Sequence, residues 1–518
     1  METNYGILSL IPALLAIILA FKTKNVVLSL IISLFTGTLI IAGGNPWTAL
    51  QSLFADYLFV DITGSSSAQT IVMMAIVGGF VALIEKSGGA QALARSVAKS
   101  INTRVKAQVS CWIGGLAIFF SDSGNSLILG PIFRPIFDRL KVSREKLSYI
   151  LDSTSSPVCI LVPITGWGVY IMSIIAQEYE TLGIVESDAT VFMKAIPFQF
   201  YAITALFLIP FIAFSGKEFG SMAKAEKRIV YENKLFNDGL TEIQSENEPI
   251  SSKAKEAKTR NIVIPLIVLF GIIFAMFISW GFPTQNIPGS KIRVALTSGY
   301  LMASIVAMIL IIKDKIMTFN ECFDTFMKGI QRMSYILAII VIAWGVGSVC
   351  SNLGTSSFIV ESTQGVLSPH LIPAFIFVIG AVISFATGTS WGTFAILLPI
   401  GINMAYSFDV SMYVTIAAVL SGGLFGDHCS PISDTTILSS TAAACDHVEH
   451  VRTQLPYALI AAIGSFIGYL VAGFMGGVWA VTLPIAIIAT VILYIIASKL
   501  WGESIPKQID DNVEIKVD

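Results

Sequence analysis

The chain has 518 residues, of which 54% are hydrophobic and only 13% are charged, and its formal net charge is −2. Because a soluble domain is about one quarter charged, this composition excludes a soluble enzyme and a disordered scaffold. The nearly neutral balance gives no reason to expect a nucleic-acid partner. The charges gather in two segments, with 17 in residues 215–260 and 8 in residues 499–518. The rest of the chain is poor in charge and rich in apolar residues, which is typical of an all-α polytopic membrane protein.

Apolar segments of spanning length follow one another from the N-terminus onward. They divide the chain into two membrane halves, residues 1–214 and 261–498. Residues 215–260 form a predicted cytoplasmic loop between the halves, and residues 499–518 form a predicted cytoplasmic tail. About eleven full crossings are expected, at 5–21, 25–42, 68–85, 147–175, 193–214, 261–280, 293–312, 332–352, 411–441, 456–477 and 479–498.

Two further apolar stretches are each interrupted near the middle by a polar cluster. Residues 105–138 are interrupted at 121–126, and residues 371–407 are interrupted at 387–393. Each stretch is compatible with two spans, or with one hairpin that enters the membrane and leaves on the same side. Cytoplasmic loops collect Lys and Arg, and these residues lie at both ends of the first stretch and at neither end of the second. The pattern favours two re-entrant hairpins from opposite sides.

The same charge pattern orients the whole chain. Basic clusters at both edges of 215–260 place that loop inside, whereas 176–190 holds acidic residues without Lys or Arg and is expected outside. With eleven crossings, the N-terminus is outside and the C-terminus is inside. The short loop around Lys291 and Arg293 is the exception to this path.

The two halves resemble each other at an offset of about 270 residues. An amphipathic stretch at 48–60 matches 318–331, and Gly88 matches Gly354. Because the first copy starts outside and the second inside, the repeat is predicted to be inverted, as in many secondary transporters. Further matches follow in the same order, namely Phe120, Gly124 and Pro131 with Phe385, Gly392 and Pro399, and then Asp152–Pro157 with Asp427–Pro431.

Four polar clusters, at 121–126, 153–157, 387–393 and 426–436, predict breaks in the membrane helices. Non-helical backbone at membrane depth persists only against protein or a watery cavity. Each break frees carbonyl oxygens and adds hydroxyls or a carboxylate, which can bind a small cation. The predicted ion- or substrate-binding residues are Asp122, Ser123, Asn125, Asp152, Ser155, Ser156, Thr387, Thr389, Ser390, Thr393, Asp427, Ser430, Ser433 and Asp434, and the sodium candidates among them are Asp122, Asn125, Thr393, Asp427 and Asp434.

Structural roles stay open for some of these acids. Asp122, Asp152 and Asp434 are also compatible with helix capping. Glu85 lies at the cytoplasmic end of its predicted span and is expected to be solvated, and His450 is expected to line a cytoplasmic helix end.

The longest motif carries a family resemblance. The run Gly426-Asp427-His428-Cys429-Ser430-Pro431-Ile432-Ser433-Asp434-Thr435-Thr436, followed by Ser439-Ser440 and Cys445-Asp446-His447, resembles the hallmark of the NhaC Na+/H+ antiporter family. Residues 152–157 and 163–168 resemble the first-repeat counterpart of that motif. The resemblance implies hairpin tips and unwound helices around sodium and substrate, an elevator-like movement of a transport domain, and often a dimer.

The resemblance covers both Na+/H+ exchangers and carriers that couple sodium to organic acids or amino acids. The leading hypothesis is exchange of Na+ for H+ across the plasma (inner) membrane by alternating access, with both ions competing for carboxylates where the repeats cross. The alternative is Na+-coupled transport of an amino acid or small organic carboxylate. The expected partners are the lipid bilayer, the transported ions and a second copy of the chain. No cofactor is expected beyond Na+ and H+ as coupling ions, and no enzyme motif is present in the sequence.

Overall fold

The computed structural model describes residues 5–98, 101–235, 257–282, 284, 287–355, 358, 362 and 368–506. Its first half contains α1 (Ile11–Thr23), α2 (Val26–Ile41), α3 (Pro46–Ser52), α4 (Phe59–Thr63), α5 (Ser65–Lys86), α6 (Gly89–Ala98), α7 (Arg104–Ala117), α8 (Asp122–Arg139), α9 (Arg144–Ser153), α10 (Ser156–Cys159), α11 (Gly166–Thr181), α12 (Asp188–Ala195) and α13 (Phe200–Ser215). The junction contributes β1 (Lys217–Phe219) and α14 (Gly220–Lys227).

The second half repeats this succession of helices. It contains α15 (Arg260–Ser279), α16 (Gly289–Lys313), α17 (Phe319–Arg332), α18 (Ser334–Asn352), α20 (Ile372–Thr387), α21 (Ser390–Ser407), α22 (Met412–Cys429), α23 (Asp434–Ala443), α24 (His447–Phe474), α25 (Trp479–Trp501) and β2 (Gly502–Ser504). The predicted all-helical fold is confirmed, because the described strands form only one antiparallel pair, β1 with β2.

Helix length and composition support a multi-span membrane protein. Seven of the described helices are long and apolar enough to cross a bilayer, or up to nine if two bent helix pairs each count as one span. Each of the eleven predicted spans coincides with a helix or with a broken helix. The count omits 147–175 and 411–441, which are divided into shorter helices, and 5–21, whose apolar helix is short. Large apolar side chains face outward on α15 and α25, as lipid-facing helices require, including Ile267, Phe274, Ile278, Ile488 and Ile492.

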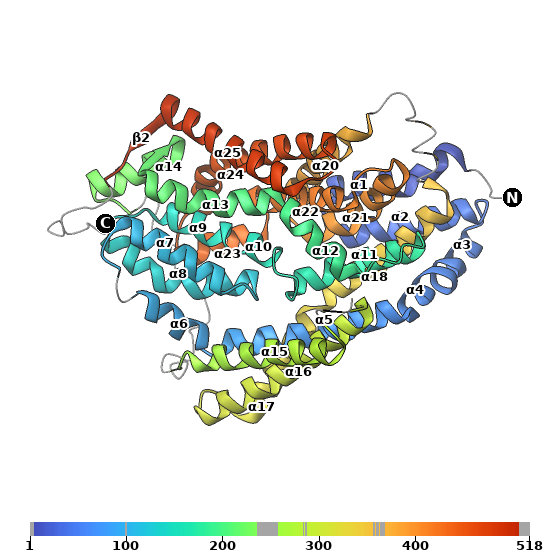
Figure 1. Ribbon diagram of the computed structural model, residues 1–518, viewed down its shortest axis with the longest axis horizontal. Coiled ribbons are helices and arrows are strands. Elements are labelled where there is room, and N and C mark those ends of the chain that lie inside the picture. Colours follow the sequence, from blue (N-terminus) through green and yellow to red (C-terminus); the bar gives the residue numbers. More distant parts are fainter. Residues whose placement is uncertain are drawn as a thin grey trace.

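The internal repeat is visible as matched elements of equal length. α8 and α21 both have 18 residues, and their internal prolines, Pro131 and Pro399, occupy equivalent positions. Gly88 and Gly354 follow equivalent helices and both have a positive φ, 71° and 70°. In Figure 1, the hairpin of α7 and α8 lies toward the end of the molecule that carries α14, whereas α20 and α21 lie toward the opposite end, near α1 and α2. This arrangement agrees with an inverted repeat.

One layer of the molecule consists of α5, α15, α16 and α17, along the lower edge of Figure 1. Small residues let these helices approach closely: a Cβ placed on Gly329 of α17 would lie 2.2 Å from the carbonyl oxygen of Gly78 on α5. The layer is joined to α12 by a buried ion pair between Arg293 and Asp188, at 2.5 Å. This pair accounts for one of the two basic residues of the exception in the charge pattern, because the positive charge of Arg293 is neutralised within the protein.

The predicted loop 215–260 is not solvated throughout, because many side chains in its described part, 215–235 and 257–260, are buried. β1 and α14 pack against the membrane half, and Glu226 is only 1% exposed. Glu226 pairs with Arg104, Lys146 pairs with Glu218 at 2.8 Å, and Arg228 pairs with Glu145 at 2.7 Å. Residues 236–256 lie outside the described residues, as do residues 507–518 of the predicted tail.

Candidate ion-binding site

All four predicted helix breaks are present, at positions that local residues explain. Ile118–Ser121 separate α7 from α8, and Gly388-Thr389 separate α20 from α21. Thr154-Ser155 separate α9 from α10, and Ser430–Ser433 separate α22 from α23. In the last break Pro431 supplies no backbone donor, and at the hairpin tip Gly388 has a φ of 69°, which glycine adopts without strain.

In the first repeat, the tip of the α7–α8 hairpin contacts the break between α9 and α10. Asp122 begins α8; its carboxylate accepts a bond from Trp167 Nε1 at 3.1 Å, and its backbone carbonyl accepts one from Ser155 Oγ at 2.6 Å. Asn125 is fully buried and its Nδ2 donates to the carbonyl oxygens of Gly115 and Thr154, both at 2.9 Å. The Asn125 amide therefore bridges the ends of α7 and α9, and it satisfies the Thr154 carbonyl, which lies where α9 ends.

In the second repeat, Asp427 lies between the tip of the α20–α21 hairpin and the break between α22 and α23. Its carboxylate is 3% exposed and accepts bonds from Ser390 Oγ and Ser433 Oγ, each at 2.8 Å. Ser430 Oγ donates to the carbonyl oxygen of Phe385 at 2.7 Å. Neutral hydroxyls from α21 and from the α22–α23 break thus hold one buried carboxylate.

The two repeats cross so that each hairpin packs against the other repeat's broken helix. α8 packs against α23, and α21 packs against α11. Ser126 on α8 contacts Ser439 on α23 through their hydroxyls at 2.9 Å. Trp167 and Trp391 are in contact where α11 meets α21, with ring centroids 4.8 Å apart and ring planes tilted by 48°. The predicted crossing of tips and breaks is therefore formed by the fold.

Asp434 lies on the far side of the break that follows Asp427. α22 ends at Cys429 and α23 begins at Asp434, so no continuous helix joins the two acids. Asp434 is exposed at the start of α23, and its Oδ1 accepts the N–H of Thr435 at 3.1 Å. Its geometry is that of an acid in the first turn of a helix, where the helix dipole favours it.

The other predicted residues mostly bond within their own helix. Ser123 N–H donates to Asp122 Oδ1 at 2.6 Å. Thr387 Oγ1 donates to the carbonyl oxygen of Ile383, and Thr393 Oγ1 donates to that of Thr389, both at 2.9 Å.

Three buried oxygens around the crossing lack a hydrogen-bond partner among the described residues. They are Asn125 Oδ1, Ser156 Oγ and Thr436 Oγ1. Buried polar atoms are almost always paired, so such atoms call for an ion or a water. Within the same described part, the groups that donate to Asp122 and Asp427 are neutral. Oxygens without donors and carboxylates without countercharges fit a small cation.

The hydrogen-bond and ion-pair partners of Asp152 and Glu85 were not predicted from the sequence. Asp152 is 1% exposed and contacts His450 Nε2 at 3.2 Å and Gln454 Nε2 at 2.7 Å. Glu85, expected to be solvated, instead accepts a bond from Ser121 Oγ at 2.5 Å and pairs with Arg332 at 2.9 Å. These partners come from distant helices and have no local sequence signal.

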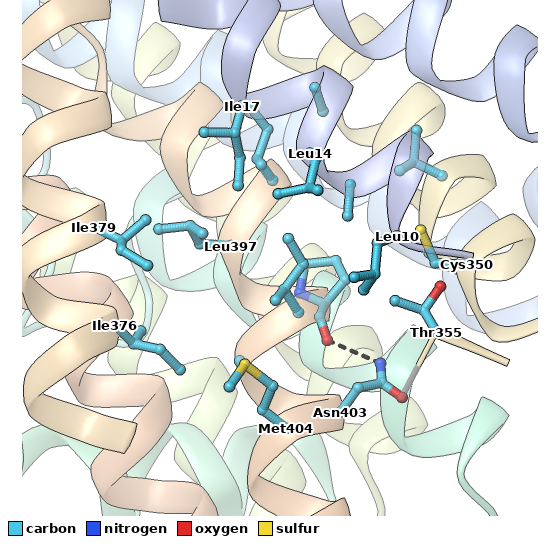
Figure 2. Close-up of a pocket in the computed structure, with 18 of the residues that line it drawn as sticks. Leu10, Leu14, Ile17, Cys350, Thr355, Ile376, Ile379, Leu397, Asn403 and Met404 are labelled. Atoms are coloured by element: carbon cyan, nitrogen blue, oxygen red, sulfur yellow. Dashed lines mark hydrogen bonds between the residues drawn. The ribbon is translucent and has the colours of Figure 1, made fainter. Parts of the chain in front are cut away.

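A cavity of about 170 Å³ lies elsewhere, between α1, α18, α20 and α21 (Figure 2). Its lining is mainly apolar and includes Leu14, Ile376 and Leu397. Asn403 lies at the edge of this cavity, and its Nδ2 donates a hydrogen bond to the carbonyl oxygen of Pro399 at 2.8 Å. None of the predicted site residues lines this cavity, and its apolar lining does not suit a bare cation.

Comparison with known proteins decides the family. A model of the Na+/H+ antiporter family matches residues 158–474. The chain belongs to the Na+/H+ antiporter family. The resemblance stated from the 426–447 motif is thereby confirmed, and the matched region contains the α22–α23 break, α21 and the start of α24.

Individual relatives place this Na+/H+ antiporter family member among transport proteins. An uncharacterized protein of Haemophilus influenzae is 34% identical over 489 residues, which cover 91% of this chain and 92% of that protein. The malate-2H(+)/Na(+)-lactate antiporter of Bacillus subtilis is 34% identical over 111 residues, 21% of this chain and 24% of that protein. The crystal structure of the Alcanivorax borkumensis YdaH transporter has a similar fold, with a TM-score of 0.58 and 14% identity over 83% of this chain and 89% of that one.

Proposed function

We propose that this member of the Na+/H+ antiporter family exchanges Na+ for H+ by alternating access, in the plasma (inner) membrane. The observation that carries the proposal is the environment of Asp427. This carboxylate is buried between a hairpin tip and a helix break, and among the described residues its hydrogen-bond donors are the hydroxyls of Ser390 and Ser433. A buried carboxylate without a countercharge is costly, and a bound cation or a proton removes that cost.

The crossing supplies further groups for a sodium ion. Asp122 begins α8 at the other tip, and Asn125 Oδ1 is buried without a partner. A movement that separates tips from breaks would open these oxygens to water on one side at a time. The proposed exchanger is a multi-pass protein surrounded by lipid, and we extend the proposal to a homodimer on the resemblance stated above.

The test is transport by the purified protein in proteoliposomes. An inward Na+ gradient is expected to move protons outward and alkalinise a vesicle lumen loaded with a pH-sensitive dye, without any organic substrate. Apparent sodium affinity is expected to fall as the pH is lowered, because protons compete with sodium. Sodium uptake that moves no protons would contradict the proposal.

A second candidate is Na+-coupled transport of a small organic carboxylate or an amino acid. α21 begins at the crossing without a side-chain cap, so its first N–H groups and positive dipole end are available to a carboxylate. One relative is named a malate-2H(+)/Na(+)-lactate antiporter. Uptake of labelled malate, lactate and amino acids by the same vesicles separates this candidate from simple ion exchange.

A further inference from the structure

His450 lies at the centre of a second polar cluster, next to the proposed cation site. The cluster is formed by α9, α22 and α24 and is completed by Tyr201 of α13. His450 is 0% exposed, although it lies only one turn from the start of α24. Its Nε2 faces Asp152 Oδ2 at 3.2 Å, and Gln454, one turn further on α24, donates to the same oxygen at 2.7 Å.

A second imidazole borders the same group. His428 Nδ1 contacts the hydroxyl of Tyr201 at 2.7 Å, and its Nε2 contacts Ser153 Oγ at 3.0 Å. Gln454 Nε2 also donates to the backbone carbonyl of His428. The two imidazoles differ in one respect: both ring nitrogens of His428 have partners, whereas His450 Nδ1 is buried without one among the described residues.

That difference gives His450 capacity for one more proton. A neutral His450 that donates from Nε2 to Asp152 leaves a bare lone pair at Nδ1. A proton taken up there produces an imidazolium beside the Asp152 carboxylate, and the buried pair becomes neutral overall. Without that proton the pair keeps one negative charge, which burial disfavours. The surrounding titratable groups are Asp152 on α9, His428 and then Asp427 on α22, Tyr201 on α13, and Glu449 on α24 itself.

The cluster is connected to the cation site through shared hydrogen bonds. Ser439 Oγ donates to Asp152 Oδ1 at 3.4 Å and also contacts Ser126 Oγ on the first hairpin at 2.9 Å. Asp152 lies two residues before Thr154, whose carbonyl accepts the Asn125 amide. His428 follows Asp427 directly in the chain. A change of charge in the His450 cluster therefore changes the electrostatic potential at the cation site, and a change of charge at the cation site does the same at the cluster.

We propose that His450, together with Asp152, carries the exchanged proton at a position separate from Asp427. The inference rests on the proposed Na+/H+ exchange and assigns its two ions to two adjoining groups. His450 holds the proton at its unpartnered Nδ1, Asp152 stabilises the imidazolium, and Gln454 orients the carboxylate. Electrostatic repulsion between the bound cation and the nearby proton then prevents both from being bound at once. The two ions therefore do not need to share one carboxylate.

The test compares the wild type with His450→Gln, in which an amide that does not titrate replaces the imidazole. The control is His370→Gln, because His370 is exposed on the short turn Pro369–Leu371. Two rates are measured in proteoliposomes: proton movement driven by a Na+ gradient, and exchange of ²²Na+ for unlabelled Na+. We expect His450→Gln to lose at least tenfold in proton movement while it retains sodium–sodium exchange. Its apparent sodium affinity is expected to vary little with pH, whereas the wild type and His370→Gln change by up to about tenfold per pH unit.

Asp152→Asn is a second variant in case His450→Gln does not fold. Its amide oxygen still accepts the bond from Gln454, and the same loss of proton movement is expected. Proton-coupled exchange by either folded variant with the wild-type pH profile would overturn the inference and leave the proposed function standing. If the wild type itself moves no protons in response to sodium, the proposed function fails, and the inference fails with it.

Discussion

Ser390 Oγ donates a hydrogen bond to Asp427 Oδ2 at 2.8 Å, and this contact joins the tip of the second hairpin to the second broken helix. Ser390 is the first residue of α21, and Asp427 belongs to the last turn of α22. A hairpin that moves relative to the broken helix must break this bond. The contact therefore couples the position of the tip to the charge state of the carboxylate.

Asp427→Asn is expected to abolish sodium-driven proton movement while the protein still inserts and folds. The amide keeps the shape and one oxygen acceptor for Ser390 or Ser433, but it loses the negative charge that a cation requires. Rates in proteoliposomes should fall at least tenfold, which corresponds to about 1.4 kcal/mol. The matched control is Asp409→Asn, because Asp409 is exposed in a turn with a φ of 52°, which asparagine also adopts. An Asp427→Asn variant with the control's rate would remove Asp427 from the site.

Asn125→Leu is expected to destabilise the protein, whereas Thr393→Val is expected to be nearly neutral for stability. The Asn125 amide donates to the carbonyl oxygens of Gly115 and Thr154, and Gly115 also accepts the Ile118 N–H, so leucine leaves the Thr154 carbonyl without its side-chain donor. Such a loss costs about 1–3 kcal/mol for each unsatisfied group. The Thr393 hydroxyl bonds only within its own turn of helix. The thermal midpoint of each variant in detergent checks this difference, and equal midpoints would contradict it.

Apparent sodium affinity gives a separate measurement for the same two variants. Sodium binding at the tips predicts weaker affinity in both. Unchanged affinity in both would place the ion elsewhere.

Glu226→Gln is expected to loosen the junction between the two halves. Glu226 pairs with Arg104 and accepts bonds from the N–H and hydroxyl of Ser143, at 2.9 and 2.6 Å. Removal of one partner of a buried ion pair costs about 3–5 kcal/mol. Thermal unfolding and proteolysis after Lys or Arg check the prediction, with the exposed Glu232→Gln as control. Equal protease resistance in both variants would show that the pair contributes little.

The orientation of the chain is tested by chemical labelling. Single cysteines at Lys224, exposed on α14, and at Val185, which is 98% exposed, are introduced into a protein without its six native cysteines. An impermeant thiol reagent is expected to reach them from opposite sides of the membrane, with Lys224→Cys on the cytoplasmic side. Labelling of both from the same side would remove the topology on which the inverted repeat depends.

The sequence predicted the helix breaks well because glycine, proline and hydroxyl residues act locally on the backbone. It misplaced their edges by a few residues: Ser121 caps α8, its Oγ accepting the Gly124 N–H at 2.9 Å, so Asp122 and Asn125 lie within the first turn of a helix. It also could not show that Asp434 begins a new helix after the break that follows Asp427. Patterns of residue type report local conformation, and the direction of a side chain after a break depends on packing.

The partners of the buried charges could not be predicted from the sequence. Asp152 and His450 are 298 positions apart, and only the packing of α9 against α24 brings them together. The charged junction is typical of a solvated loop by composition, but Arg104, Glu145 and Lys146 on the membrane half neutralise its charges. Long-range pairing of this kind leaves no periodic signal.

The pairing of β1 with β2 has a consequence for how the protein is made. Glu218 lies opposite Glu503, so a strand between the two membrane halves receives its backbone partner from the segment that follows α25. Until the ribosome has released that segment, the backbone N–H and carbonyl groups of β1 that face β2 have no partner there. The junction can therefore be completed only after α25 has been synthesised. A message truncated before Gly502 yields a chain that contains every predicted membrane span but cannot complete the junction.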